Sequence, residues 1–391
     1  MKVILIVLDS VGIGAAPDAA KYGDQGSATL PHMAGAVGGL KLPTLGKMGL
    51  GNIPALLPGG LPIRGVDPVA NPVASYGAMQ EVSEGKDTVT GHWEIAGLEI
   101  IPGFHIFPPA PPSFPPDLVA AFERRTGRKA IGDKAASGTA IIEELGARHM
   151  KEGCWIAYTS ADSVFQIAAH EEVIPLEELY RGCLVARELC DAYKVGRVIA
   201  RPFVGKPGAF KRTENRRDYA FKPSEPTVLE RLVAAGVPVY AVGKIEDIYA
   251  HRGITETLHT GNTRDSSELV ARWTREKKKG LIIANFIDFD MVYGHRRDAA
   301  GYAHALEETD RWLGAYLPLL AKDDLLVLTA DHGNDPTFRG TDHTREFVPL
   351  LAYQPGRAPL SLGIRRGFYD IAQSIASFFG IPALPRGSSF L

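Results

Sequence analysis

The sequence predicts an α/β protein built around a parallel β-sheet and interrupted by a second, smaller α/β unit. Short runs rich in Val, Ile and Leu recur along the chain, and segments with apolar residues at helical spacing lie between them. Continuous apolar runs are typical of strands that are buried on both faces, as in parallel sheets. A proline-rich stretch marks the place where this pattern breaks, and so indicates the interruption.

Four apolar runs are expected to form buried strands of the sheet. They cover residues 3–8, 237–243, 281–287 and 325–330. Helices are expected over residues 226–236 and 302–321, where apolar side chains recur at the spacing of one helix face. The alternation favours a sheet covered by helices. Because the apolar runs fall well short of the roughly 20 residues that span a bilayer, we expect no membrane insertion.

The middle of the chain follows a different pattern. Residues 101–118 form a proline-rich loop, which cannot belong to a central strand because proline donates no ladder hydrogen bond. Beyond this loop, helices are expected over residues 118–127 and 137–150, and strands over residues 155–163 and 197–203. Either Ser137 or Thr139 is expected to cap the second of these helices.

The expected domain organisation is therefore discontinuous. The smaller unit should end near the basic loop at residues 211–219, after which the long alternation of strands and helices resumes. We expect a core domain formed by residues 1–98 and 218–391, with a smaller domain at residues 99–217 inserted in it. Two domains also fit the length of 391 residues, which exceeds what one hydrophobic core usually serves.

The composition excludes several classes of protein. Apolar residues make up 45% and charged residues 23% of the chain, as in ordinary globular proteins. The 43 Lys and Arg nearly balance the 45 Asp and Glu, so no global field recruits nucleic acid or an anionic membrane. Any site for an anion must therefore be local.

The cysteines and the first residues favour a cytoplasmic protein. The three cysteines, an odd number without a CxxC pair, argue against a disulfide scaffold and against a zinc ribbon. The apolar stretch at residues 3–8 is short for a signal peptide and is followed at once by Asp9. We expect a reducing compartment.

Acidic and histidine residues follow three of the predicted strands. They are Asp9 after residues 3–8, then Asp288, Asp290, His295 and Asp298 after residues 281–287, and Asp331, His332 and the later His343 after residues 325–330. In open α/β sheets, side chains at the carboxyl ends of strands face the ligand crevice. Carboxylates and imidazoles that meet there would repel each other or lie unpaired unless a cation held them.

The mixture of residue types indicates which metal to expect. Asp and His without Cys suit Mn or Zn better than Ca or Mg, and two such groups suit a pair of ions about 4 Å apart. Mn is the first choice. Taken singly, each Asp fits a turn residue or a helix cap, and each His fits an ordinary core or surface histidine. Their joint appearance after three strands favours the two-metal site.

A candidate nucleophile lies in the segment GKDTVTGHWE, residues 85–94, which offers Thr88 and Thr90. A hydroxyl bound to a metal loses its proton more readily, and a second ion can neutralise charge on a phosphoryl group. If Thr88 caps a helix that runs through His92, backbone N–H groups there would also face an anion. The segment by itself fits plain helix capping better and does not separate the two threonines.

Basic residues offer a place for a phosphate group. Arg197, Arg201 and Arg212 lie in the middle unit, and Lys244 follows the apolar run at residues 237–243. A guanidinium group can bind a phosphate through two parallel hydrogen bonds. Most arginines lie on surfaces without such a role. The hypothesis that these residues bind phosphate therefore depends on a metal site nearby.

Six segments together resemble the phosphopentomutase family. They are VLDSVGIGAAPDA, GKDTVTGHWEIAG, YTSADSVFQIAAHEE, VGRVIARPFVG, DFDMVYGHRRD and TADHGNDPTFRGTDHTRE. DHGND with the later DHT also resembles the wider alkaline phosphatase superfamily, which includes cofactor-independent phosphoglycerate mutase. GKDTVTGHWE and GHRRD narrow the resemblance to the pentomutases, and the match spans nearly the whole chain.

The resemblance implies a fold and a set of metal ligands. The fold would be an alkaline-phosphatase-like three-layer α/β/α core with an inserted smaller α/β cap domain. One Mn ion would be held by Asp9, Asp331 and His332, and a second by Asp290, His295 and His343. The cap residues Ser160, Asp162, Arg197 and Arg212, with Lys244 from the core, would hold the sugar and its distal phosphate.

The resemblance also implies a reaction. Phosphorylated Thr88 would give its phosphoryl group to the free hydroxyl of ribose 1-phosphate or ribose 5-phosphate, or of the deoxyribose equivalents. The resulting 1,5-bisphosphate would reverse its orientation in the active site, and Thr88 would then remove the other phosphoryl group. A bisphosphate such as glucose 1,6-bisphosphate would prime Thr88.

Two other functions fit parts of the sequence. A metal-dependent phosphatase or phosphodiesterase of the same superfamily would use the same ligands and Thr88 but release phosphate to water. A sugar-phosphate binding protein would keep the scaffold without catalysis, yet binding gives no reason to retain a nucleophile beside two metals.

Overall fold

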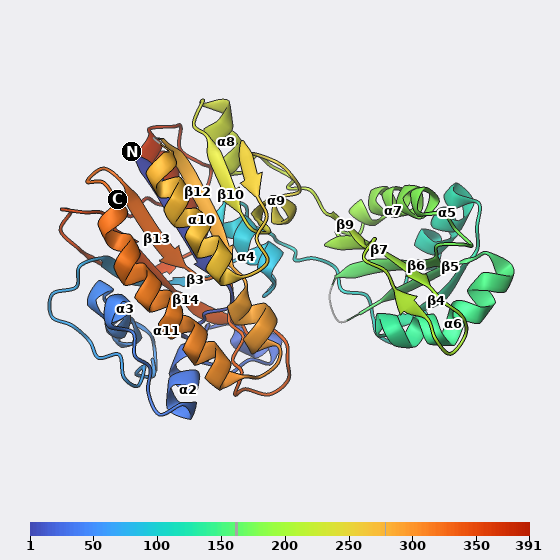
Figure 1. Cartoon of the computed structure of the whole chain (residues 1–391), viewed down its shortest axis with the longest axis horizontal. Helices are drawn as coiled ribbons and strands as arrows, with labels where there is room; N and C mark the ends of the chain where they lie inside the picture. Colours follow the sequence, from blue (N-terminus) through green and yellow to red (C-terminus); the bar gives the residue numbers. More distant parts are fainter. Residues whose placement is uncertain (161–162, 278) are drawn as a thin grey trace. The chain divides into compact units, whose positions relative to one another are not determined.

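The computed structural model describes residues 1–160, 163–277 and 279–391. Contacts between residues divide the chain into two compact units. The core unit consists of Met1–Pro102 and Pro223–Leu391, and the inserted unit consists of Gly103–Lys222. The inserted unit therefore interrupts the chain of the core unit, and Figure 1 shows the chain coloured from end to end.

The core unit is assembled from both ends of the chain. Its first part forms β1 (Lys2–Leu8), β2 (Gly14–Ala15), α1 (Ala19–Tyr22), α2 (Thr29–Ala36), α3 (Pro43–Met48), the 3-10 helix η1 (Leu50–Leu56), β3 (Ser75–Gln80) and α4 (Thr88–Ile95). Its second part forms α8 (Val228–Ala234), β10 (Val239–Val242), α9 (Ile245–Ile248), β11 (Glu256–Leu258), α10 (Thr263–Glu276), β12 (Gly280–Phe286), the π-helix η2 (Phe289–Gly294), α11 (Ala299–Tyr316), the 3-10 helix η3 (Leu317–Leu319), β13 (Leu325–Thr329), β14 (Glu346–Tyr353), β15 (Ser361–Arg366) and α12 (Tyr369–Phe379). The four apolar runs expected as strands are β1, β10, β12 and β13, which confirms that prediction.

One large sheet forms the middle layer of a three-layer α/β/α arrangement. The strand order is β11, β10, β12, β1, β13, β14, β3, β15, with the short β2 paired to β14. The central strand β1 pairs in parallel with β12 and with β13. The strand β14 runs antiparallel to both of its neighbours, β13 and β3. The predicted α/β fold class is confirmed, with β14 as an exception to the parallel arrangement.

The sequence pattern did not predict β14. The strand contains Pro349, whose register partner on β3 is Ala78, and a proline normally argues against a position inside a sheet because it donates no ladder hydrogen bond. The other elements follow from burial. All residues of β1 are buried, as expected for a strand covered on both faces.

Helices cover the sheet on both sides. Figure 1 shows α10 and α11 in front of the central strands. Helix α11 packs on α2 and α3, while α12 packs on α4 and α8. The helix expected over residues 302–321 ends at Tyr316 and continues as η3, because Pro318 cannot supply the backbone N–H that a further turn needs.

The inserted unit has its own sheet and core. It forms α5 (Pro116–Thr126), β4 (Ala130–Ala135), α6 (Gly138–Glu152), β5 (Trp155–Thr159), β6 (Val164–His170), α7 (Leu176–Asp191), β7 (Arg197–Val204), β8 (Lys211–Arg212) and β9 (Arg217–Ala220). The strand order is β4, β5, β6, β7, β8, with β9 paired to β7. One apolar cluster joins the sheet to α5 and α7, and another joins it to α6. Ser137, one of the two expected caps, accepts from the Ala140 N–H at 3.3 Å.

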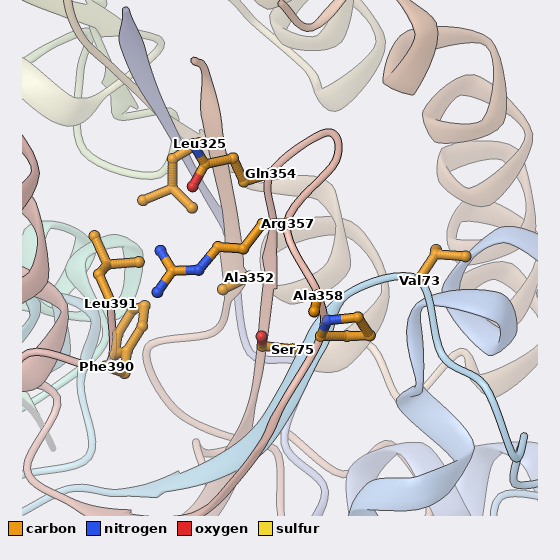
Figure 2. Close-up of a pocket in the computed structure, with 10 residues that line it drawn as sticks. Val73, Ser75, Leu325, Ala352, Gln354, Arg357, Ala358, Phe390 and Leu391 are labelled. Atoms are coloured by element: carbon orange, nitrogen blue, oxygen red, sulfur yellow. The ribbon is translucent and has the colours of Figure 1, made fainter. Parts of the chain in front are cut away.

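A small pocket lies at the edge of the core sheet where β13 and β3 begin. Leu325 and Ser75, the first residues of these strands, line it together with Ala352 near the end of β14, and Figure 2 shows Arg357 and Leu391 beside them. Its volume of about 10 Å³ leaves room for little more than one water molecule. The pocket is therefore too small to hold a sugar phosphate.

Membrane insertion was not expected from the sequence. Within the parts of the chain that the structure describes, no helix combines the length and the apolar character that crossing a bilayer requires.

Candidate metal centre

The expected ligands lie at one edge of the core sheet because of its topology. Asp9 follows β1, Asp290 lies in η2 after β12, and the pair Asp331 and His332 follows β13. These three strands are adjacent and parallel, so their carboxyl ends meet. His343 precedes β14, whose reversed direction brings its amino end to the same edge.

Asp290, His295 and His343 form one group of possible ligands, with donor atoms that lie within 4.8 Å of one another. Asp290 Oδ2 lies 3.1 Å from His295 Nε2, and Asp290 Oδ1 lies 3.4 Å from His343 Nε2. The Nε2 atoms of the two histidines are 3.2 Å apart. His295 Nδ1 lies 2.7 Å from the carbonyl oxygen of Thr341. An N–H donated there leaves Nε2 free to bind a metal, which is the usual support for a ligand histidine.

Asp9, Asp290 and His332 form a second group by the same distance. His332 Nε2 lies 3.5 Å from Asp9 Oδ1, and its Nδ1 lies 3.1 Å from the carbonyl oxygen of Gly333. Asp9 Oδ1 is buried and has no hydrogen-bond partner among the described residues. A buried carboxylate oxygen without a partner costs free energy unless a cation occupies the space beside it, so this donor set fits a metal ion.

Asp331 lies deeper than the other carboxylates and is fully buried. Its Oδ1 accepts from the Ser10 N–H at 3.1 Å, and its Oδ2 lies 3.1 Å from His92 Nδ1 and 3.5 Å from His332 Nε2. His92 Nδ1 also lies 2.9 Å from the carbonyl oxygen of Thr88. Sequence reasoning gave His92 no role, although its place one helical turn after Thr88 was a signal.

Electrostatics separates the carboxylates. Burial, followed by the charges of Asp331 and Asp290, raises the pKa of Asp9 well above its ordinary value. Burial acts in the same direction on Asp290, but its contacts with His295 and His343 outweigh it and hold the pKa of Asp290 well below its ordinary value. The contact with Asp290 raises the pKa of His295 to about 9. The Asp9 carboxyl group thus lacks enough nearby positive charge to balance its acidic neighbours. A cation bound beside it would favour its ionised form.

Two asparagines orient the carboxylates. Asn285 Nδ2 donates to Asp9 Oδ2 at 2.7 Å, and Asn334 Nδ2 donates to Asp290 Oδ1 at 2.7 Å. Both asparagines are buried. Sequence reasoning missed them, although an amide inside the apolar run at residues 281–287 was a possible signal for Asn285, because a buried amide needs a partner.

Two of the candidate acidic residues serve local structure instead. Asp288 accepts from the Thr263 N–H at 2.9 Å, at the start of α10. Asp298 caps α11 and accepts from the Gly301 N–H at 2.8 Å. Neither belongs to a ligand group of the described residues, so Asp290 and His295 are the residues of that segment that reach the centre.

The structure distinguishes the two threonines of the segment 85–94. The cap of α4 is Asp87, whose Oδ1 accepts from the Val89 and Thr90 N–H groups at 3.1 and 3.2 Å. Thr90 is fully buried and donates its hydroxyl to Asp87 Oδ2 at 2.6 Å. The Thr88 hydroxyl instead lies 3.2 Å from His332 Nε2. The alternative that Thr88 is the helix cap is therefore wrong, because the Asp87 carboxylate caps α4.

The expected substrate-binding residues belong to different units. Lys244 follows β10 in the core unit, and its Nζ lies 3.9 Å from Met291 Sδ. Ser160, Arg197 and Arg212 belong to the inserted unit, where Ser160 follows β5, Arg197 begins β7 and Arg212 ends β8. Asp162 lies outside the described residues.

Comparison with known proteins establishes the family. The profile of the metalloenzyme superfamily matches residues 1–383. A phosphopentomutase of Caldanaerobacter subterraneus subsp. tengcongensis is 54% identical over 392 positions, which cover 100% of this chain and 97% of the relative. A phosphopentomutase of Anaeromyxobacter sp. (strain K) is 52% identical over 391 positions, which cover 100% of this chain and 98% of the relative. The chain belongs to the phosphopentomutase family.

Membership of the phosphopentomutase family confirms the resemblance found in the sequence motifs, and makes the chain a phosphomutase of the isomerase class. The fold is shared more widely. The PH0037 protein from Pyrococcus horikoshii has a TM-score of 0.50 and 15% sequence identity, over 97% of this chain and 96% of that one. At that identity the likeness concerns the fold alone.

The close packing of α4 on the centre gives a first prediction. A side chain at Gly91 would come within 2.3 Å of the Asp331 carbonyl oxygen, so Gly91→Ala must displace α4 or the segment that carries Asp331. We expect a loss of about 1–3 kcal/mol in the free energy of unfolding and weaker metal binding, measured by urea denaturation and by metal titration. Gly35→Ala in α2, where a side chain would meet nothing within 4 Å, should leave metal affinity unchanged. Equal metal affinity in both variants would contradict the prediction.

Proposed function

We propose that the chain is a phosphopentomutase that interconverts ribose 1-phosphate, or 2-deoxyribose 1-phosphate, and the corresponding 5-phosphate. The observation that carries the proposal is the position of the Thr88 hydroxyl, 3.2 Å from His332 Nε2 at the edge that gathers the candidate ligands. Full-length identity of about half to proteins named phosphopentomutase supports the choice of reaction.

We propose two Mn²⁺ ions, one held by Asp9, Asp331 and His332 and the other by Asp290, His295 and His343. Mixed carboxylate and imidazole donors without thiolate favour Mn or Zn, and the two groups of the structure share Asp290. When bound, such ions would lower the pKa of the threonine hydroxyl and neutralise charge on the phosphoryl oxygens.

The proposed reaction has two balanced halves. In the first, the free sugar hydroxyl attacks phosphorus on phosphorylated Thr88. The bond from Thr88 Oγ1 to phosphorus breaks as the new P–O bond forms, and the proton of the sugar hydroxyl is released. In the second, Thr88 Oγ1 attacks the other phosphoryl group of the 1,5-bisphosphate, and the departing sugar oxygen takes up a proton. The covalent step divides one difficult transfer into two.

We propose that an arginine-rich face of the inserted unit binds the sugar phosphate. Register places Arg201 opposite Ala168 on β6, Arg212 opposite Phe203 on β7 and Tyr158 opposite Gln166 on β6. A side chain at Gly138, the first residue of α6, would come within 2.8 Å of Tyr158 Oη and 3.3 Å of Arg212 Nη1. The face therefore combines guanidinium groups with a helix amino terminus, both of which favour phosphate. Ser160, Arg197 and Lys244 keep their proposed roles in binding the sugar phosphate.

Tyr158 supports an anion at this face. Its hydroxyl is buried and has no hydrogen-bond partner among the described residues that meets ordinary geometry. Burial raises the pKa of Tyr158, and the positive charges of Arg201, Arg212 and Arg216 oppose that rise. Arg216 is paired with the Asp218 carboxylate at 2.7 Å, so Arg201 and Arg212 supply the positive charge that a phosphate would neutralise.

We also propose a bisphosphate activator such as glucose 1,6-bisphosphate, because the cycle begins only when Thr88 carries a phosphoryl group. A cytoplasmic location is proposed on the chemistry of the cysteines. Cys154, Cys183 and Cys190 are free and buried, and free thiols are usual in a reducing compartment.

The decisive test of the reaction is phosphorus NMR of quenched, chelator-treated reactions. The Mn-loaded protein with ribose 1-phosphate and a trace of glucose 1,6-bisphosphate is expected to form ribose 5-phosphate without free phosphate, and 2-deoxyribose 1-phosphate is tested in parallel. Free phosphate that accumulates in step with substrate loss would show a phosphatase of the same superfamily instead.

The nucleophile is tested by mass spectrometry of the intact protein after incubation with the bisphosphate. We expect the wild type and Thr90→Ser to gain one phosphate, and Thr88→Ala to gain none and to lose at least about 10³-fold in kcat. Thr90→Ser keeps the hydroxyl that binds Asp87 and is the matched control. A phosphate retained by Thr88→Ala would refute the assignment.

The phosphate-binding face is tested with a pair of arginine variants. Arg212→Met is expected to raise KM for ribose 1-phosphate by about 10- to 100-fold, the loss of one charge-assisted hydrogen bond. Arg217→Met is the control, since the Arg217 guanidinium lies 3.9 Å from the Tyr180 ring centroid and not among the charges that surround Tyr158. An unchanged KM for Arg212→Met would remove the face from the proposal.

A further inference from the structure

Arg345 is a buried arginine that the proposed reaction does not use. It stands two residues after His343 and directly before β14, and only about 1% of its side chain is exposed. A guanidinium group at such a depth must find acceptors for its N–H groups, because an unpaired buried charge is strongly unfavourable. The identity of those acceptors indicates its function.

Arg345 Nε and Nη2 donate to the two oxygens of the Asp18 carboxylate at 3.2 and 3.0 Å. The other acceptors lie in the segment that leads to Thr88. Arg345 Nη1 donates to the carbonyl oxygens of Ser83 and Gly85 at 2.8 and 2.6 Å, and it contacts the Glu81 carboxylate. Arg345 Nη2 donates to the carbonyl oxygen of Glu81 at 2.8 Å. Residues 81–87, here called the 81–87 loop, join β3 to α4. One side chain therefore binds three successive alternate carbonyls of the loop.

A second set of contacts reinforces this one. The backbone N–H of Arg345 donates to Asp24 Oδ2 at 3.0 Å, and the same carboxylate lies 3.1 Å from Lys86 Nζ. Lys86 Nζ also lies 3.3 Å from Asp342 Oδ2. Asp342, directly before His343, and Arg345, two residues after it, are thus both tied to the 81–87 loop.

The beginning of the loop is also held from α4. Glu94 accepts from the Val82 N–H at 2.9 Å and from the Ser83 N–H at 2.6 Å. Glu94 also accepts from the Phe368 N–H at 2.8 Å. Glu94 therefore fixes the N–H groups of Val82 and Ser83, while the Glu84 N–H donates to the Ile100 carbonyl oxygen at 2.9 Å. Because Arg345 binds the carbonyl groups of the same loop, the loop has little freedom although it lacks regular structure.

We infer that Arg345 is a positioning residue, which holds the 81–87 loop so that Thr88 keeps its position beside the metal-binding edge. The inference rests on the proposed role of Thr88 as the nucleophile. The same short segment carries His343 towards the centre and Arg345 towards the loop, so the ligand and the nucleophile share one rigid support. A displacement of about 1 Å in a reacting group can cost about 100-fold in rate.

This role differs from that of an ordinary buried ion pair. Loss of an ion pair that only stabilises the fold would lower the free energy of unfolding and leave turnover by the folded fraction unchanged. Replacement of a positioning residue lowers kcat more than it changes KM, because the substrate still binds but the geometry of attack is lost. Loss of such a residue should also loosen the 81–87 loop selectively.

The experiment compares Arg345→Lys with wild type in the metal-loaded protein. Lysine keeps the charge but cannot bind several carbonyls as a fork. We expect kcat to fall by about tenfold or more, KM and metal affinity to change by less than about threefold, and hydrogen exchange in residues 81–87 to rise by about tenfold or more. The control is Arg365→Lys, since Arg365 of the same unit binds the Asp370 carboxylate at 2.7 Å and the Ser388 carbonyl at 2.8 Å and does not touch the loop.

The inference would be overturned by unchanged exchange in the 81–87 loop, by an unchanged kcat despite faster exchange, or by an equal fall in kcat for Arg365→Lys. A loss of metal in parallel with kcat would also overturn it, because the effect would then be general damage to the centre. Failure of the proposed function is separate, since it would appear in the wild type as hydrolysis or as absence of phosphate on Thr88. In that event the exchange data would still decide whether Arg345 holds the loop.

Discussion

The organising constraint of this structure is the meeting of three nearly buried carboxylates, Asp9, Asp290 and Asp331, at the ends of adjacent parallel strands. Two like charges about 4 Å apart repel by about 4 kcal/mol at an effective dielectric constant near 20. Asparagine donors and histidines offset part of this repulsion. Asp9 nevertheless keeps a raised pKa and an oxygen without a partner among the described residues. The edge therefore fits a metal ion, and the surrounding contacts keep the candidate ligands in place.

The reversed strand β14 allows residues distant in the sequence to share this edge. Parallel strands deliver side chains from their carboxyl ends, whereas β14 delivers His343 and Arg345 from its amino end. The residues before β14 therefore arrive from the direction opposite to the other ligands. They face β13 on one side and β3, which leads into the 81–87 loop, on the other. This position explains how one short segment can contact both the candidate ligands and the support of the candidate nucleophile.

The sequence predicted the α/β fold class and the strand ends that carry Asp9, Asp290 and Asp331, because an apolar run followed by a polar residue is a local signal. It did not predict β14, whose proline argues against a central strand. Nor could it predict that Arg345 binds Glu81, 264 positions away, since pairs of side chains distant in sequence leave no local pattern. The different contacts of the Thr88 and Thr90 hydroxyls likewise depend on the orientation of Asp87, which the spacing of residues in the sequence does not reveal.

The capping of α4 limits where charge stabilisation can come from. Helix amino termini commonly bind phosphate through free N–H groups, and the spacing of Thr88 before His92 suggested such a site. In the structure, Asp87 already accepts from the Val89 and Thr90 N–H groups, so those donors are satisfied and a carboxylate stands beside them. A phosphoryl group on Thr88 would find its compensating charge at the metal-binding edge instead. The position of Thr88 relative to that edge is therefore what catalysis would depend on, and that position is what the Arg345 contacts fix.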